Sequence, residues 1–241
     1  MLHKTSGIIL HTTNYSDTSL IVKMYTQHFG LQSYMINGVR SKRSKNKASL
    51  FQPLAMVDLE VLNSERSTLH RISELNIHYH YTSIPYNIIK SSIAFFINEV
   101  IVKSLKESHP DEELFLFLTN SLKILDLEEG NTANFHLCFL MGLSRCLGFY
   151  PQGEYSGQTA VMDLQEGRFT DHLPTHRHYL DRGQSMLFSK LMDTGYDSLT
   201  GLQISKAERK QLLQTLILYY RLHISNFSDI KSLEILEEVI S

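Results

Sequence analysis

The chain lacks the features that mark several large classes of protein. No uninterrupted apolar run approaches the roughly 18 to 20 residues that a bilayer span needs, and residues 1–10 lack the apolar core of a secretory signal. Only two cysteines occur among the 241 residues, Cys138 and Cys146, eight positions apart in one apolar segment. They are typical of small buried side chains in a reducing compartment rather than of a disulfide or a metal pair. We therefore expect a cytoplasmic protein.

Motifs of common catalytic sites are also missing. The chain has no glycine-rich phosphate loop, no Gly-x-Ser-x-Gly elbow, no His-Glu-x-x-His pair and no cysteine beside a plausible base. Scattered residues could still form a site, and four acids could hold magnesium in a nuclease: Asp17, Asp58, Glu60 and Glu74. Acids on polar strand positions are usually only solvated, so we expect a protein without enzymatic activity and keep the nuclease as an alternative.

What the chain does have is a concentrated positive segment. Residues 38–47 contain no acid and five cations: Arg40, Lys42, Arg43, Lys45 and Lys47. Without these five, 18 of the 23 Lys and Arg residues remain against 25 acids, a formal charge of −7. A segment so rich in Lys, Ser and Asn has little to bury. Such focused charge is typical of a surface that binds a polyanion, although a solvated loop or an adaptor for an acidic peptide would show the same pattern.

Residues 1–80 contain five short runs with β-branched or aromatic residues, and several of these runs alternate apolar and polar positions. We expect strands at residues 7–13, 19–26, 31–36, 54–62 and 68–75. Turn residues separate the runs, among them Asn14–Asp17 and Asn37–Gly38. Five short strands in about 70 residues predict a small closed or nearly closed barrel, either an OB-fold or an SH3-like barrel.

Residues 81–241 are expected to form a mainly α-helical domain, which makes the fold class α+β. The charge also changes near residue 80, from nine basic and five acidic residues before it to fourteen and twenty after it. Helices are expected at residues 86–105, 132–147 and 205–223, the last with a Ser205–Glu208 capping box. A further helix is expected to open at 109–113, with Pro110 in its first turn, and to close at Gly130. An irregular or β insertion is expected at about 151–182, with a hairpin around Gly167.

Several segments together resemble the N-terminal domain of the bacterial DNA repair protein family RecO. They are Gly7-Ile-Ile-Leu, Tyr15-Ser-Asp-Thr-Ser-Leu-Ile-Val-Lys-Met-Tyr-Thr, His28-Phe-Gly-Leu, Gly38-Val-Arg-Ser with the basic run, and Phe51-Gln-Pro-Leu. Leu147-Gly148 and the closing Lys231-Ser-Leu extend the resemblance into the helical part. The resemblance implies an OB-fold that binds single- and double-stranded DNA, followed by a helical domain.

The resemblance also implies a function and partners. RecO proteins act as recombination mediators in DNA repair: they anneal complementary strands and, with RecR, help RecA replace single-stranded-DNA-binding protein. The helical domain would then hold the acidic, apolar C-terminal tail of single-stranded-DNA-binding protein in an apolar groove rimmed by cations. Candidate rim residues are Lys103, Lys106, Lys123 and Arg145.

Within the barrel, the five cations of residues 38–47 are the expected phosphate contacts. Lys23, Arg66 and Arg71 could share the path. Tyr15 and Tyr34 are candidates for stacking on bases, and Tyr15 is preferred because it lies in an expected turn. Packing within the barrel is the competing interpretation for both tyrosines.

Metal binding is not expected in residues 151–182. Many RecO proteins carry a four-cysteine zinc motif there, and this chain has none of those cysteines. His172, His176 and His178 lie close in sequence, but their spacing matches no strong zinc motif. We therefore expect no metal and no cofactor.

Overall fold

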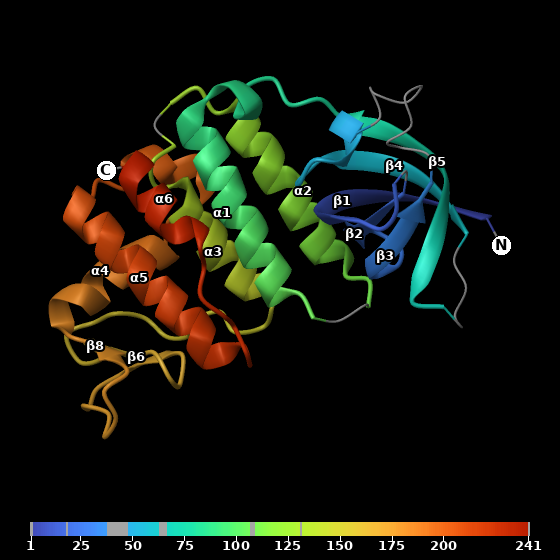
Figure 1. The fold of residues 1–241 in the computed structure, drawn as a ribbon. Coiled ribbons are helices and arrows are strands. Elements are labelled where there is room, and N and C mark those ends of the chain that lie inside the picture. Colours follow the sequence, from blue (N-terminus) through green and yellow to red (C-terminus); the bar gives the residue numbers. More distant parts are fainter. Residues whose placement is uncertain are drawn as a thin grey trace.

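The computed structural model describes residues 2–17, 19–37, 48–62, 67–106, 109–130 and 132–240, with residues 48 and 49 described in their backbone only. A small β-barrel lies at one end of the molecule and a set of helices at the other (Figure 1). A three-stranded sheet lies at the far side of the helices from the barrel. The α+β architecture expected from the sequence is confirmed.

The barrel contains five strands in the order β1-β2-β3-β5-β4, and it closes because β1 pairs with both β2 and β4. The strands are β1 Leu2–Asn14, β2 Leu20–Thr26, β3 Gly30–Ile36, β4 Met56–Leu62 and β5 Leu69–Tyr79. All neighbouring pairs are antiparallel except β3 with β5, which is parallel. This order with one parallel pair is that of an OB-fold, which decides against the SH3-like alternative.

Alternation along the strands fills the barrel interior. Val22 and Met24 of β2 point inward, as do Val57, Leu59 and Val61 of β4, and all five are buried. Tyr34, which pairs with Val22 across β2 and β3, is fully buried in the same cluster. Because successive side chains of a strand point to opposite faces, these apolar residues fill the interior and the residues between them point outward.

The helices of the second part follow a short 3-10 turn at Ile84–Tyr86. They are α1 Ile88–Ser104, α2 Glu112–Leu127, α3 Phe135–Cys146, α4 Arg182–Met192, α5 Lys206–His223 and α6 Ser232–Val239. Helix α3 is the central one, because all but three of its twelve residues are buried. Its end at the positive-φ residue Gly148 and the Ser205–Glu208 capping box of α5 were both predicted.

Two expectations about the helices need correction, and one helix was not expected. Pro110 precedes the N-cap of α2, Asp111, and so lies outside the first turn, where the Asp111 side chain accepts from the Leu114 N–H. Gly130 does not close α2, which ends at Leu127. Helix α4 was not predicted; a capping box between Asp181 and Gln184 starts it.

The β insertion is confirmed as a small sheet of β6 Val161–Asp163, β7 Arg168–Thr170 and β8 Tyr179–Leu180. Gly167 adopts a φ of 67° in the turn before β7, and a Cβ there would lie 2.7 Å from the Tyr219 hydroxyl. Only glycine therefore fits the turn. None of the helices in the described residues is long and apolar enough to cross a membrane.

Barrel and helices share one hydrophobic cluster, which includes Ile8 and Tyr25 of the barrel. Tyr25 stacks on Phe115 of α2 at a centroid distance of 6.4 Å, and its hydroxyl donates to the Asp111 carbonyl. At the other end of α2, the Tyr79 hydroxyl donates to Asp126 over 3.1 Å. Helix α2 is therefore attached to the barrel at both of its ends.

Candidate nucleic-acid interface

The outer face of β2 and β3 carries one cation, Lys23, and no acid, since neither strand contains Asp or Glu, and Arg71 of β5 lies beside it. Lys23 of β2 lies between His11 of β1 and Ser33 of β3 in the strand register. Two residues before Lys23, Ile21 pairs with Met35 of β3, and Met35 in turn pairs with Arg71 of β5. In OB-folds this face and the flanking β1–β2 and β4–β5 loops are the usual site for oligonucleotides.

Tyr15 lies in the turn between β1 and β2 and is 62% exposed. The turn is fixed by the Tyr15 N–H, which donates to the Ser19 carbonyl over 3.0 Å. The Ser19 hydroxyl in turn donates to the Asn37 side chain at the end of β3, also over 3.0 Å. An exposed aromatic ring on a fixed turn beside the β2–β3 face is well placed to stack on a base.

Tyr34 does not share this placement. Its ring lies inside the barrel, 5.8 Å from the ring of His70, and is fully buried. The competing interpretation of strand packing is therefore correct for Tyr34.

The five cations Arg40, Lys42, Arg43, Lys45 and Lys47 lie outside the described residues, as does Arg66. The nearest residues to the basic run whose side chains are described are Asn37 on one side and Leu50 on the other, both of which line one small pocket at the end of β3. The two residues that flank the basic segment therefore lie at one place on the barrel, beside Arg71. That place adjoins the acid-free outer face of β2 and β3.

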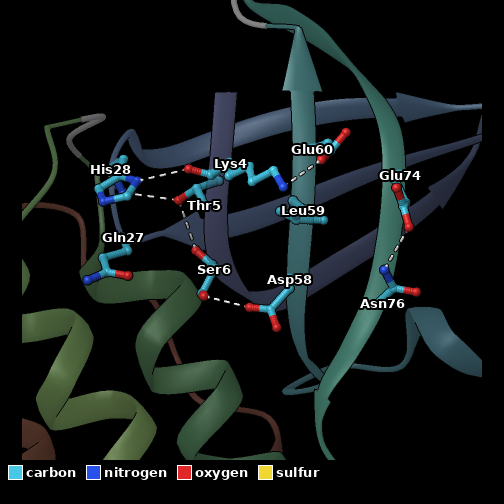
Figure 2. A pocket seen from close by; sticks show the side chains of 10 residues that line it. All are labelled: Lys4, Thr5, Ser6, Gln27, His28, Asp58, Leu59, Glu60, Glu74 and Asn76. Carbon is cyan, nitrogen blue, oxygen red and sulfur yellow. Dashed lines mark hydrogen bonds and ion pairs between the residues drawn. The ribbon is translucent and has the colours of Figure 1, made fainter. Parts of the chain in front are cut away.

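The opposite side of the barrel is acidic and internally paired. A hollow of about 440 Å³ there is lined by Asp58, Glu60 and Glu74, and Figure 2 shows these side chains on β4 and β5. Glu60 and Glu74 are directly opposite each other in the register. Like charges in that position repel a polyanion, so this side is unsuited to DNA.

Each of these acids already has a partner. Asp58 accepts from the Ser6 hydroxyl over 2.7 Å and lies 3.1 Å from His78, while Lys4 lies 3.2 Å from Glu60. Burial raises the pKa of Asp58, but the hydrogen bonds from Ser6 and His78 outweigh it and leave that pKa below its ordinary value. Within the described ranges no three His, Cys, Asp or Glu residues are grouped so that they could hold a metal ion. The four acids of the nuclease alternative do not form such a group.

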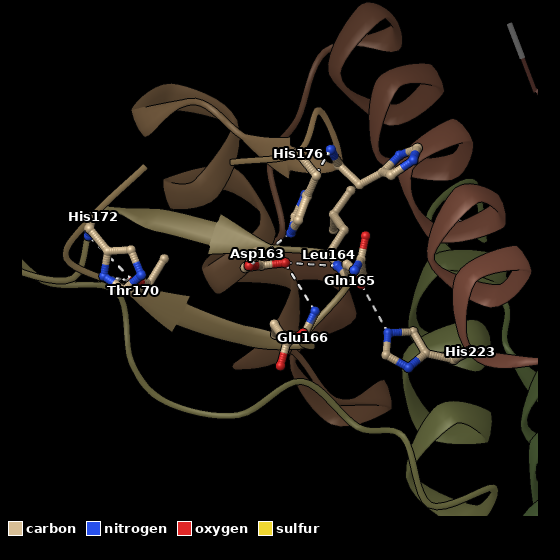
Figure 3. Close-up of polar contacts among 9 residues, drawn as sticks. Asp163, Leu164, Gln165, Glu166, Thr170, His172, His176 and His223 are labelled. Atoms are coloured by element: carbon tan, nitrogen blue, oxygen red, sulfur yellow. Dashed lines mark hydrogen bonds and ion pairs between the residues drawn. The ribbon is translucent and has the colours of Figure 1, made fainter. Parts of the chain in front are cut away.

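Of the three histidines of the insertion, His172 lies apart from His176, and the His176 and His178 rings lie beside each other with a centroid distance of 6.2 Å (Figure 3). The His172 ring contacts the Thr170 hydroxyl and Asp171, at the opposite end of the β6–β7 hairpin from His176. His176 lies 3.3 Å from Asp163 through Nε2 and accepts from the backbone N–H of His178. These contacts use the ring nitrogens within the protein itself.

The four cations proposed for the helical part differ in what they contact. Lys103 forms an ion pair with Glu99 over 2.9 Å, Lys123 lies over the Tyr79 ring, and Arg145 lies over the Tyr150 ring at 4.2 Å. Lys106 is exposed and lines a cleft of about 560 Å³ among the ends of α1, α2, α3 and α5. Of the four, Lys106 is the one beside a cleft with several apolar walls.

Both cysteines are placed as small apolar side chains. Cys138 is buried in α3, and burial raises the pKa of its thiol to about 12. Burial likewise raises the pKa of Cys146 to about 11. Neither thiol is ionised near neutral pH, so neither is primed as a nucleophile.

Comparison with known families accounts for nearly the whole chain. Residues 1–81 match the family described as recombination protein O N terminal, and residues 85–234 match recombination protein O C terminal. The chain belongs to the RecO family. The two matches meet at the 3-10 turn between β5 and α1.

Whole-length relatives agree with this assignment. The chain is 38% identical to the DNA repair protein RecO of Phocaeicola vulgatus over 241 residues, with 100% of both chains covered. It is also 38% identical to that of Bacteroides fragilis, with 99% of both covered, and 30% identical to that of Porphyromonas gingivalis, with 98% covered. The resemblance inferred from short segments is confirmed over the full RecO length.

Two features of this RecO chain were not predicted from its sequence. One is Asp126, which binds the segment between barrel and helices, and the other is Glu99, which accepts from the backbone of Lys231 and Ser232 at the start of α6. The backbone N–H groups that donate to these two carboxylates lie 42 or more residues away in the chain, so no local pattern marks them. The Lys231-Ser-Leu segment was the one visible signal, because Ser232 is the residue that Glu99 holds.

Proposed function

We propose that this RecO-family protein binds single- and double-stranded DNA and anneals complementary single strands during DNA repair and homologous recombination. The observation that carries the proposal is the uneven charge of the barrel: Lys23 and Arg71 lie at a face whose strands β2 and β3 contain no acid, beside a segment of five cations, and an acidic hollow lies on the β4–β5 side. No bond chemistry is needed. Two strands repel through their phosphates, and a surface that neutralises phosphates on both lets their bases meet.

The proposal also includes assisting a recombinase to load on protein-coated single-stranded DNA. RecR, RecA and the C-terminal tail of single-stranded-DNA-binding protein are the expected partners, by the properties of the family. The cleft beside Lys106 suits an acidic, apolar tail, because Leu105, Leu114 and Phe149 supply apolar walls, and the one acid of the lining, Asp111, is engaged as the N-cap of α2. In this proposal, DNA binds to residues 1–80, and the C-terminal tail of single-stranded-DNA-binding protein binds to residues 81–241.

Binding without cleavage distinguishes this proposal from the nuclease and from the adaptor. A labelled single strand incubated with the full chain should be retarded in a gel with magnesium and equally with a chelator, and should be recovered at full length. A mediator holds phosphates through cations and needs no metal. Shortened product only with magnesium would establish the nuclease, and absence of any retardation at low salt would favour the adaptor for an acidic peptide.

Tyr15→Ala is expected to weaken single-strand binding by about tenfold, because stacking one base on an aromatic ring is worth roughly 1–3 kcal/mol. The melting temperature should barely change, since the ring is 62% exposed. Fluorescence anisotropy and a thermal melt measure the two quantities.

Tyr86→Ala is the matched control, because Tyr86 is 85% exposed and lies in the turn before α1, away from the β2–β3 face. It should leave DNA affinity unchanged. A Tyr15→Ala variant that melts early but binds normally would assign Tyr15 to the fold instead.

A further inference from the structure

A small pocket opens where β3 and β5 separate. The two strands pair at only three positions, the last of which joins Met35 to Arg71, and β5 then continues beside β4 alone. The gap is floored by the 3-10 turn Ala48–Phe51. The pocket has a volume of about 260 Å³ and is lined by Met35, Ile36, Asn37, Leu50, Phe51, Arg71, Ile72, Ser73 and Leu75.

The lining is apolar with a few polar groups at the rim. Met35, Leu50 and Ile72 are partly exposed apolar side chains, which is an unfavourable placement unless something covers them. Arg71 is exposed, and its side chain makes no hydrogen bond or ion pair within the described part of the chain. Asn37 uses its side-chain oxygen to accept from Ser19, which leaves its NH₂ group to donate to a ligand.

This combination suits a planar heteroaromatic ring. A flat ring can lie against the methionine and leucine side chains, while a guanidinium stacks on ring faces and also attracts phosphate. The Asn37 amide can donate to an oxygen or nitrogen on the edge of a base. An aliphatic ligand would use the apolar walls but would leave Arg71 and Asn37 without a role.

The size of the pocket limits the ligand to a single ring system. A dry cavity of roughly 150 Å³ holds one benzene molecule. A pocket of about 260 Å³ therefore has room for one pyrimidine or purine, and the sugar and phosphate must stay outside. The pocket also lies near the Tyr15 turn, to which the Ser19–Asn37 hydrogen bond links it.

We propose that this pocket at the barrel mouth receives one nucleobase of the bound single strand, with Arg71 stacked on or beside the ring. The inference rests on the proposed DNA-binding function and adds a contact to the base itself. A base bound in this pocket fixes the position of its nucleotide. The phosphates of the neighbouring nucleotides then lie within reach of Lys23 and the basic segment. Since every base has a flat apolar face, the site tolerates any sequence.

Two probes separate base contacts from phosphate contacts. One is a strand of twelve thymidines, and the other is a strand of the same length in which every base is absent and every phosphate is kept. The wild-type protein should bind the thymidine strand more tightly. The ratio of the two affinities, measured by anisotropy at one salt concentration, reports only on bases.

Ser73→Phe should fill the pocket from its rim and reduce that ratio by about tenfold, the value of one stacked base. Affinity for the strand without bases should stay as in the wild type. Arg71→Lys keeps the charge and removes the planar group, so it should lower the ratio while leaving the salt dependence unchanged. Asn76→Phe is the matched control, because Asn76 lies on the same strand but lines the acidic hollow.

The outcomes distinguish a failure of the base-pocket proposal from a failure of the proposed DNA binding. If neither strand binds at low salt, the proposed DNA binding fails and the pocket proposal fails with it. If both strands bind and Ser73→Phe or Arg71→Lys keeps the full wild-type ratio, DNA binding stands and the base pocket is wrong. Arg71→Lys decides the matter if Ser73→Phe does not fold.

Discussion

Replacing Arg40, Lys42, Arg43, Lys45 and Lys47 together with glutamine is expected to remove most of the salt dependence of single-strand binding. Each neutralised phosphate on a single strand contributes about −0.7 to the slope of log affinity against log salt, so five contacts give roughly −3.5. A fourfold rise in salt should therefore weaken the wild-type complex on the order of 100-fold. The variant should show only a shallow slope and a loss of affinity that is similar for every base sequence.

The fold should survive this substitution, because a run of Lys, Ser and Asn has little apolar surface to bury. A matched variant removes five exposed cations from the helical part: Arg177, Arg182, Lys190, Lys206 and Lys210. It changes the net charge equally and should keep the wild-type slope. A partial loss in the first variant would assign the remaining contacts to Lys23, Arg66 and Arg71, and an unchanged slope would mean that the basic segment is not the phosphate site.

Asp126→Ala is expected to destabilise the junction between barrel and helices by roughly 3 kcal/mol, because it leaves one buried and several partly buried donors without an acceptor. The Asp126 carboxylate accepts from the backbone N–H groups of Thr82, Ser83 and Ile84 at 2.9 to 3.1 Å. It also accepts from the Tyr79 hydroxyl, and the residue is only 2% exposed. The melting temperature should fall by about 6–12 °C for a chain of this length.

The same carboxylate gives a pH dependence of known sign. Burial raises its pKa, but the N–H groups of Thr82, Ile84 and Ser83 outweigh burial and hold the pKa of Asp126 at about 2. Its contribution is therefore present above the ordinary aspartate pKa of about 3.9 and is lost as pH falls toward 2. Thermal melts from pH 5 to pH 2 should show a smaller decline for Asp126→Ala than for the wild type.

Asp171→Ala is the control for this experiment, since Asp171 is an exposed acid beside His172 and its removal should change the melting temperature little. Equal melting temperatures for Asp126→Ala and the wild type would show that the carboxylate does not hold the junction.

The sequence predicted the barrel strands well, because alternation is a local property. Val22, Met24 and Tyr34 differ from their neighbours Lys23 and Ser33 in a period of two that any half-buried strand must show. The parallel pairing of β3 with β5 was not predicted, because it joins residues more than 30 positions apart through three register positions. Closure of the barrel, and with it the pocket at Arg71, depends on that pairing.

Prediction was weaker wherever a contact between distant segments decides the outcome. The turn residues placed Tyr15 outside the strands, whereas the burial of Tyr34 depends on the register that pairs it with Val22. Lys103 and Lys106 lie one turn apart on or beside α1, yet Glu99 engages the first and leaves the second at a cleft. Helix α4 was missed because its start is marked by Asp181 and Gln184 within a polar segment with little apolar period.

The rate at which complementary strands anneal tests the central claim most directly. Two labelled strands mixed with the full chain at low salt should form duplex faster than they do alone, because charge on both is neutralised at one surface. The five-glutamine variant should return the rate toward the spontaneous value, and the matched variant of the helical part should keep the wild-type rate. If the wild-type protein binds single strands but anneals them no faster than buffer does, the account of this protein as a strand-annealing mediator is wrong.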